Sequence, residues 1–396
     1  MDKFTFKTPE GTRDLMFDEC ETFNFVKNTL SEMFSSRGYY EVKTPVLEYF
    51  DLFTLESAHF KQEDMYKLCD NTGRILVLRP DMTMPIARLA STRLKGAPLP
   101  IRLYYIQDVF RQNPGYKGRS NDIAQAGIEL IGLNGLLSDL EVIITAARAI
   151  EQCGLFDYKI EIGHAGIFKK LIDRLNIDSD SKEEIRIYIE TKNYNALENK
   201  LKTYPEPMVK AIKELPKLFG GREILDTALE IFGDLASEEL GFLYKLYDSL
   251  NAELQDKIYL DLGLVHRNNY YTGTVFRGYI MGSGDMVVSG GRYDSLLSEF
   301  GCDLPATGFA IDLNALTGVL LSKSKGIGVK NPDMLVFALP SYEIKAIRFM
   351  EEQINKGTIC ELLPFDSKES AIKQANIRKA SRIAVIGENC EIFDLV

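Results

Sequence analysis

Three polar side chains interrupt two apolar stretches, within residues 101–132, that are predicted to be strands joined by a loop. Arg111 closes the first stretch, and Gln125 and Glu129 lie in the second. Strand residues four apart share a face, so antiparallel pairing across the loop would bring all three side chains toward one pocket. A guanidinium there is a fixed fork for a carboxylate or a phosphate. The alternative is an edge hairpin with a salt bridge and a solvated basic loop.

Two more polar pairs could add chemistry to such a pocket. Asp81 and Thr83 stand where a predicted strand meets a predicted helix. Either side chain could cap the helix, or the carboxylate and hydroxyl could receive an ammonium group. Tyr270 and Tyr271, followed by Thr, Val and Phe, predict a strand with one ring on each face. Tyr270 is expected in the core whatever the function.

The composition is that of a globular protein with two or three domains. The chain has 396 residues, of which 45% are hydrophobic and 26% charged. Its formal charge of −10 argues against a large nucleic-acid footprint, which needs a basic surface. No apolar run approaches the roughly 20 residues of a membrane span. We therefore expect a cytoplasmic protein without a signal peptide or a membrane segment.

The cysteines and histidines do not show the spacing of a metal site. Six cysteines are scattered without a C-x-x-C pair, and three histidines lie far apart at positions 59, 164 and 266. This pattern indicates reduced thiols rather than a disulfide framework, and no zinc-type ligand set. We expect neither a metal nor a cofactor.

The hydrophobic periodicity predicts the elements that position these residues. A helix at 18–36 leads into a strand at 39–44, either a dimer-forming unit or ordinary core. A helix at 137–153 begins with Ser138 and Glu141, which are spaced as a capping box. Residues 165–254 are rich in Lys and Glu and predict an inserted region of short amphipathic helices with solvated charged faces.

The last part of the chain predicts a second, smaller domain. The sequence SGGRYD at 289–294 follows a strand and is expected to lead into a helix at 293–300. Residues 322–332 are polar, contain glycine and predict a linker. Strands and helices alternate after it, the pattern of a small α/β domain with a largely parallel sheet. We therefore assign domains to residues 1–325 and 331–396.

Several segments together resemble histidyl-tRNA synthetase, a class II aminoacyl-tRNA synthetase. The resemblance implies an α+β fold in which an antiparallel sheet of six strands is flanked by helices, with a dimer formed through the first motif and a histidine-sized pocket. It runs from residue 9 to about residue 320. The matching segments are 9–14 with 39–48 for the first motif, 78–83 for amino-group binding, 109–129 for the second motif, 264–276 for the tyrosine strand, and 289–294 with 308–310 for the approach to the third motif.

The resemblance also implies roles for the residues at matching positions. Asp81 and Thr83 would meet the α-amino group of histidine, and Arg111 would meet a carboxylate or an ATP phosphate. The imidazole end would be lined by the remaining four candidates, Gln125, Glu129, Tyr270 and Tyr271.

Departures from the synthetase pattern argue against catalysis. The position of the synthetase's catalytic arginine holds His266, and that of the third-motif arginine holds Ala315. Losing one such cation costs on the order of a hundredfold in rate. A synthetase-like body without these cations resembles the regulatory-subunit family of ATP phosphoribosyltransferase. That resemblance implies no enzyme activity and no tRNA, but a short-form catalytic subunit as partner, a role in the first step of histidine biosynthesis, and feedback by free histidine.

Two enzymatic alternatives remain open. One is a divergent histidyl-tRNA synthetase or another adenylate-forming ligase. The other is a hydrolase that uses Asp81 and Glu129 as paired carboxylates, although no spacing signal supports it.

Overall fold

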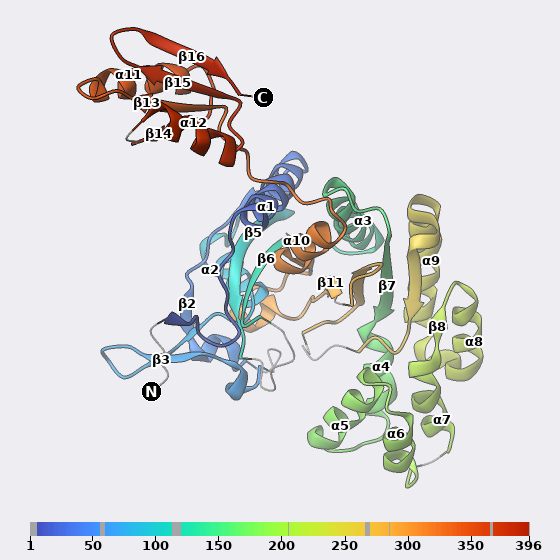
Figure 1. The fold of residues 1–396 in the computed structure, drawn as a ribbon. Helices are drawn as coiled ribbons and strands as arrows, with labels where there is room; N and C mark the ends of the chain where they lie inside the picture. Colours follow the sequence, from blue (N-terminus) through green and yellow to red (C-terminus); the bar gives the residue numbers. More distant parts are fainter. Residues whose placement is uncertain are drawn as a thin grey trace. The chain divides into compact units, whose positions relative to one another are not determined.

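The computed structural model describes residues 6–55, 60–112, 120–204, 206–265, 270–284, 286–364 and 367–395. The chain forms two compact units, Met1–Ile327 and Gly328–Val396, and each is described by itself (Figure 1). None of the described helices is long and apolar enough to cross a membrane.

A sheet of nine described strands organises the first unit. Its six central strands run antiparallel, as the resemblance implied, and strands β1 and β9 add to them in parallel. The predicted α+β class is confirmed. In spatial order the strands are β1 (Tyr40–Glu41), β5 (Ile101–Phe110), β6 (Asp122–Ile131), β12 (Ala306–Asp312), β11 (Met286–Arg292), β10 (Thr274–Ile280), β7 (Tyr158–His164), β9 (Ile258–Asp261) and β8 (Phe219–Gly220).

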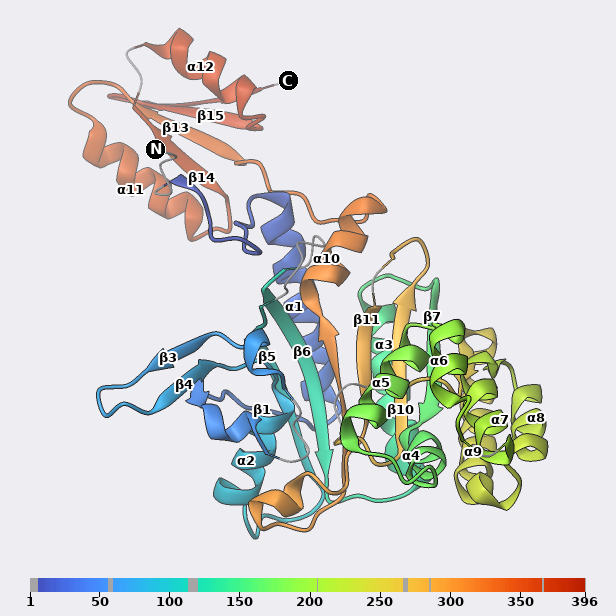
Figure 2. The ribbon, with the colours of Figure 1, turned by 90° about the horizontal axis from the view of Figure 1, so that it is seen from below.

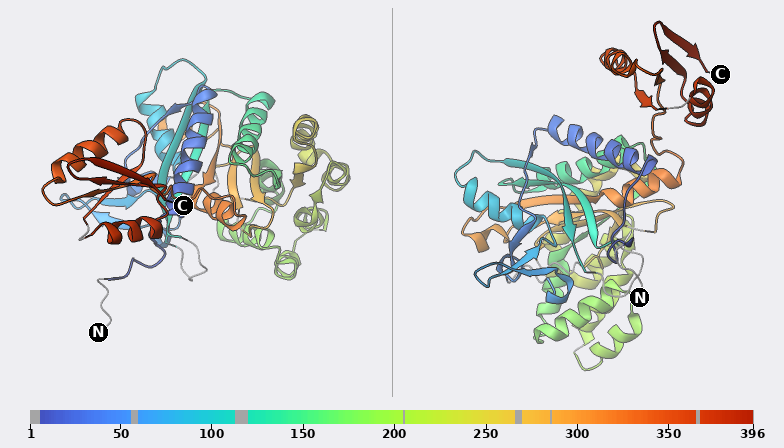
Figure 3. Two further views of the ribbon diagram at one scale, coloured as in Figure 1. Left: turned by 45° about the horizontal axis from the view of Figure 1, so that its top comes forward. Right: turned by 60° about the vertical axis from the view of Figure 1, so that its left-hand side comes forward.

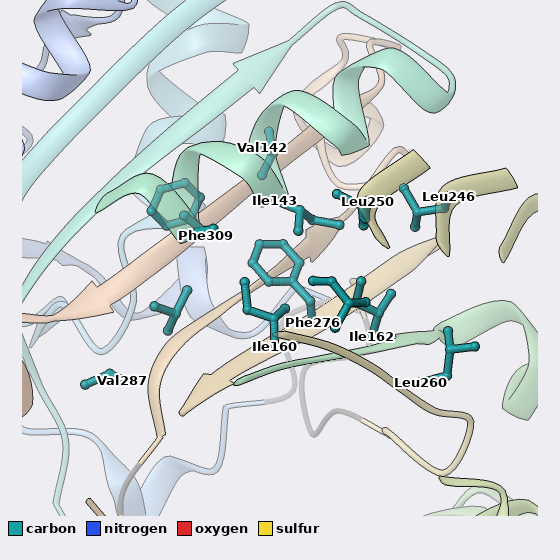
Figure 4. Close-up of a cluster of buried hydrophobic side chains, with 14 of the residues drawn as sticks. Val142, Ile143, Ile160, Ile162, Leu246, Leu250, Leu260, Phe276, Val287 and Phe309 are labelled. Atoms are coloured by element: carbon teal, nitrogen blue, oxygen red, sulfur yellow. The ribbon is translucent and has the colours of Figure 1, made fainter. Parts of the chain in front are cut away.

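The larger core lies on one face of this sheet. Helices α1 (Asp18–Ser36), α3 (Leu136–Gln152) and α10 (Leu313–Ser322) contribute to it. The apolar residues of α1 recur every three or four positions, which places Val26, Leu30 and Phe34 on one buried stripe. Figure 4 shows Phe276 and Phe309 pointing from the sheet into this core.

A smaller core lies on the opposite face. It contains Leu103, Tyr105 and Val109 of β5 together with Met84 and other residues of helix α2 (Thr83–Arg93). Next to it, β2 (Leu47–Tyr49), β4 (Ile75–Leu78) and β3 (Lys67–Cys69) form a small antiparallel sheet (Figure 2). The start of α2 therefore lies on the same side of the main sheet as the odd-numbered residues of β5.

The predicted helical insertion is present. Its helices lie together beside the sheet, drawn in green to yellow in Figure 3. They share the larger core through residues such as Leu171, Ile185 and Leu246. The helices are α4 (Ala165–Asp173), α5 (Ser179–Glu190), α6 (Tyr194–Leu201), α7 (Glu206–Glu214), α8 (Glu223–Phe232) and α9 (Ser237–Leu254).

The second unit has a sheet with a helix on each face. Strands β14 (Cys360–Leu363), β13 (Met334–Ala338) and β15 (Arg382–Ile386) are parallel, and β16 (Cys390–Asp394) is antiparallel at the edge. Helices α11 (Glu343–Ile354) and α12 (Lys368–Ile377) pack against separate sets of strand residues. The sequence did not predict β16, whose side chains are mostly exposed.

Three local predictions were wrong. Helix α3 begins at Leu136 after Gly135, so Ser138 is not its cap, and its hydroxyl donates to the Gly135 carbonyl instead. The predicted helix at 293–300 is a single 3₁₀ turn, η7 (Leu297–Phe300). The predicted strand at 39–44 contributes only Tyr40–Glu41 to the sheet.

Candidate functional site

A buried carboxylate occupies the centre of the sheet face that carries the smaller core. Glu129 on β6 is 1% exposed. The Thr83 hydroxyl donates to its Oε1 atom over 3.1 Å, and the Tyr293 hydroxyl donates to its Oε2 atom. Gly308 is the residue paired with Glu129 on β12, and any side chain there would collide with Oε2. The glycine therefore leaves the space that this carboxylate fills.

Burial changes the charge of this carboxylate. It raises the pKa of Glu129 to about 8, and the charge of Asp81 adds to the shift, whereas the hydrogen bonds from Tyr293 and Thr83 oppose it. In this structure Glu129 is therefore largely protonated at neutral pH. A cationic group placed beside it would restore the ionised form.

Asp81 supplies a second buried acid at the start of α2. Its Oδ1 atom accepts a hydrogen bond from the Met84 backbone N–H over 3.0 Å, so the capping role is real. Burial raises the pKa of Asp81, whereas Arg111 and the helix N–H groups lower it. Arg111 donates from Nε to the Pro80 carbonyl over 2.7 Å. Its charge thus lies beside Asp81, at the acidic end of the site.

The two tyrosines lie together rather than on opposite faces, which corrects the prediction. Strand β10 begins only at Thr274, so the alternation of a strand does not apply to Tyr270 and Tyr271. Their rings are 4.7 Å apart at 53°. The Tyr271 ring lies over Gly291, whose Cβ, if present, would be 2.8 Å from it. Gly291 is needed for this close approach and not for a turn, because it lies within β11.

Gln125 shares the face but is separated from the carboxylate. It precedes Glu129 by four residues on β6, and the residue midway between them is Gly127. A side chain at Gly127 would come within 2.5 Å of the Tyr105 hydroxyl, so the Tyr105 ring lies between the two. Among the described residues, no hydrogen bond joins the Gln125 amide to the other candidates.

Tyr105 and Tyr293 complete the site and were not predicted. Burial raises the pKa of both phenols, and the nearby Glu129 charge adds to the shift. In the sequence Tyr105 has the pattern of an ordinary apolar strand residue. The one available signal was its odd number, which it shares with Arg111. Tyr293 lies in SGGRYD, where the sequence predicted the start of a helix.

Ala315 is the one of the two positions predicted to match a synthetase arginine that the structure describes. Ala315 lies in the first turn of α10 and packs against the larger core, and its N–H donates to Asp312 Oδ1 over 2.9 Å. His266 lies outside the described residues. In the described part of the chain, no three His, Cys, Asp or Glu side chains form a group that could hold a metal.

The arginine of SGGRYD has a structural partner. Arg292 is 5% exposed, and its Nε atom donates to Asp139 Oδ1 over 3.0 Å. The Thr274 hydroxyl donates to the other oxygen of Asp139 over 2.7 Å. This buried cluster ties β10 and β11 to α3 and leaves Arg292 no part in the pocket.

Comparisons with known proteins give the family. The family model for histidyl-tRNA synthetase matches residues 11–316. An ATP phosphoribosyltransferase regulatory subunit from Clostridium kluyveri is 40% identical over 377 residues, covering 93% of this chain and 96% of the relative. One from Clostridium acetobutylicum is 40% identical over 381 residues, covering 95% and 94%.

Solved structures give the same family and fold. A protein from Bacillus halodurans C, described as an ATP phosphoribosyltransferase regulatory subunit/histidyl-tRNA synthetase, has a TM-score of 0.83 at 28% identity, covering 98% of this chain and all of that one. Histidyl-tRNA synthetase from Nostoc sp. PCC 7120, at 19% identity and a TM-score of 0.76, shares the fold. The predicted kinship with a regulatory rather than a catalytic subunit is confirmed. The chain belongs to the ATP phosphoribosyltransferase regulatory subunits, within the histidyl-tRNA synthetase-like family.

Proposed function

We propose that this chain binds free histidine in the pocket around Glu129 and passes its presence to the catalytic subunit of an ATP phosphoribosyltransferase. One observation carries the proposal. Two buried acids, Glu129 of β6 and Asp81 at the start of α2, lie on the same side of the main sheet, and burial raises the pKa of both. Histidine has two basic groups, an ammonium and an imidazole, and can satisfy both acids at once.

The neighbouring groups give this pocket selectivity. Thr83 and Tyr293 fix the Glu129 carboxyl from both sides, and the Tyr271 ring offers an apolar face for a flat ring. Burial raises the pKa of Asp81, and the positive charge of Arg111 partly offsets this rise. The proposed binding residues are Asp81, Thr83, Arg111, Gln125, Glu129, Tyr270 and Tyr271.

We propose that bound histidine is not activated. Adenylation depends on cations that position and stabilise the phosphates, and Ala315 cannot supply one. Histidine-dependent exchange of pyrophosphate into ATP tests this directly. The proposal expects no exchange above background, and robust exchange would favour the adenylate-forming ligase.

The catalytic partner is proposed to be the short-form ATP phosphoribosyltransferase chain, in the cytoplasm, where the six free cysteines stay reduced. We also propose self-association through the first motif, where Tyr40, Leu47 and Tyr49 are exposed. Exposed apolar side chains mark a contact surface where they form one patch.

Feedback by histidine tests the regulatory part of the proposal. The reconstituted complex should be inhibited by histidine when it contains the unaltered chain. A complex with Glu129→Gln should need at least tenfold more histidine for the same inhibition. A matched complex with Glu198→Gln, at an exposed position of α6, should behave like the unaltered one. Equal inhibition in all three would place the histidine sensor elsewhere.

A further inference from the structure

An arginine on the same sheet face as Glu129 has no role in the site described above. Arg277 lies on β10, where Phe276 on one side of it and Ile280 further along point into the larger core. Alternation in the strand therefore directs Arg277 to the opposite face. Arg277 pairs with Ser289 of β11, and Ser289 pairs in turn with Ala310 of β12. The sheet face between Arg277 and Tyr105 therefore carries only small side chains.

Arg277 lies opposite Glu161 of β7, and the charges of Glu161 and Asp261 lie near its guanidinium, but its direct contacts to Glu190 and Val265 are long. Its Nη2 atom lies 3.6 Å from Glu190 Oε1 and 3.4 Å from the Val265 carbonyl oxygen, both long contacts. Its Nε atom is buried and has no hydrogen-bond partner among the described residues. A guanidinium carries five N–H donors, so this cation keeps capacity for another acceptor. The side chain is 19% exposed, which leaves it accessible to a ligand.

The other arginines on this part of the sheet have fixed partners. Arg111 donates to the Pro80 carbonyl and lies beside Asp81. Arg292 is paired with Asp139. Arg277 is therefore the described arginine whose position and donors best match an anionic group of a ligand.

The sheet geometry gives the span between the two ends of the site. The Glu129 carboxylate lies over Gly308 of β12, and two strand spacings separate β12 from β10. With an offset of two residues along the strand, Arg277 Cα lies roughly 12 Å from that carboxylate. An arginine side chain and one amino acid together fill this length. The charges of Asp81, Glu129 and Arg277 all contribute to the pKa of the Tyr271 phenol, so its ring lies near both ends of the site.

We infer that Arg277 binds the α-carboxylate of the ligand whose basic groups meet Glu129 and Asp81. This inference rests on the proposed function, since it takes the ligand to be an amino acid with a basic side chain. The site then offers two acids for the ammonium and the imidazole of histidine, and one cation for its carboxylate.

The test compares histidine with histamine, which lacks the carboxylate, by calorimetry on the full chain. Arg277→Gln should weaken histidine binding roughly ten- to hundredfold, the range for a hydrogen bond to a charged group. Histamine binding should change less than about threefold. A loss that is equal for the two ligands, or no loss for histidine, would overturn the inference.

A second variant separates ligand binding from a tether to the helical insertion. Glu190→Gln removes one of the acids near Arg277, beside Glu161 and Asp261, while keeping the guanidinium. If Arg277 binds ligand, this variant should bind histidine at least as tightly as the unaltered chain. If Arg277 only anchors α5, both variants should lose affinity alike. Failure of the unaltered chain to bind histidine would contradict the proposed function as well, whereas binding unaffected by Arg277→Gln contradicts only this inference.

Discussion

Replacing Glu129 by Gln should change how stability depends on pH. The folded chain holds this carboxyl with a pKa of about 8, above its ordinary value of 4.5, mainly because of burial. Between these values the unfolded chain binds fewer protons at this position than the folded chain. Stability must therefore fall as pH rises through this window, and it is fully present below it. Gln has the same shape and does not titrate.

The size of the effect follows from the shift. Each pKa unit corresponds to about 1.4 kcal/mol. From pH 5 to pH 8 the unaltered chain should lose on the order of 3 kcal/mol relative to Glu129→Gln. Near pH 5 the two should differ little, since Gln can keep the hydrogen bond from Thr83 and contact the Tyr293 hydroxyl. At pH 8 the variant should be the more stable protein, although it binds histidine less well.

The assay is urea unfolding followed by circular dichroism, without histidine and at one protein concentration, at several pH values from 5 to 8. Taking the difference between the two proteins removes the contribution of groups that titrate alike in both. Glu198→Gln on the surface is the control and should follow the unaltered chain at every pH. Parallel stability curves for Glu129→Gln and the unaltered chain would refute the reasoning about this buried acid.

Three further outcomes are expected. Gly308→Ala should push the Glu129 carboxylate aside, lower the free energy of unfolding by about 1–3 kcal/mol in urea and weaken histidine binding in calorimetry. The control is Gly318→Ala, whose Cβ would meet nothing within 4 Å. It should neither lower the free energy of unfolding nor weaken histidine binding. Arg292→Met should leave Asp139 buried without its cation and cost about 3–5 kcal/mol in urea unfolding, and a loss below 1 kcal/mol would contradict the buried pair. Histidine binding at pH 7 should release well under half a proton per site, because the proton that leaves Glu129 passes to the imidazole, which is mostly neutral in free histidine; heats that vary with the ionisation enthalpy of the buffer as one full proton per site requires would count against this.

Elements with one clear periodicity were predictable from sequence. The stripe of Val26, Leu30 and Phe34 gave the observed bounds of α1. The alternation along β5 and β6 predicted the face of Glu129, whose partner in the observed pairing is Leu103. These predictions succeed because an element buried on one side repeats its apolar residues at the period of a helix or a strand.

Features set by distant partners were not predictable. Ser138 and Glu141 have the spacing of a capping box, but Glu141 pairs with Arg102 and Tyr39 across the fold. Tyr293 reaches Glu129 from the far side of the site only because β12 lies between β6 and β11. The joint packing of Tyr270 and Tyr271 depends on where β10 begins, which the tyrosines themselves do not determine. The contacts of Glu141 and Tyr293 join residues that no short sequence window contains.

The most direct measurement is calorimetric titration of histidine into the purified full chain. We expect one histidine bound per chain, with affinity at least tenfold lower in Glu129→Gln and unchanged in Glu198→Gln. An unaltered chain that gives no binding heat at any temperature tested, or a Glu129→Gln variant that binds histidine as tightly as the unaltered chain, would contradict histidine binding in this pocket.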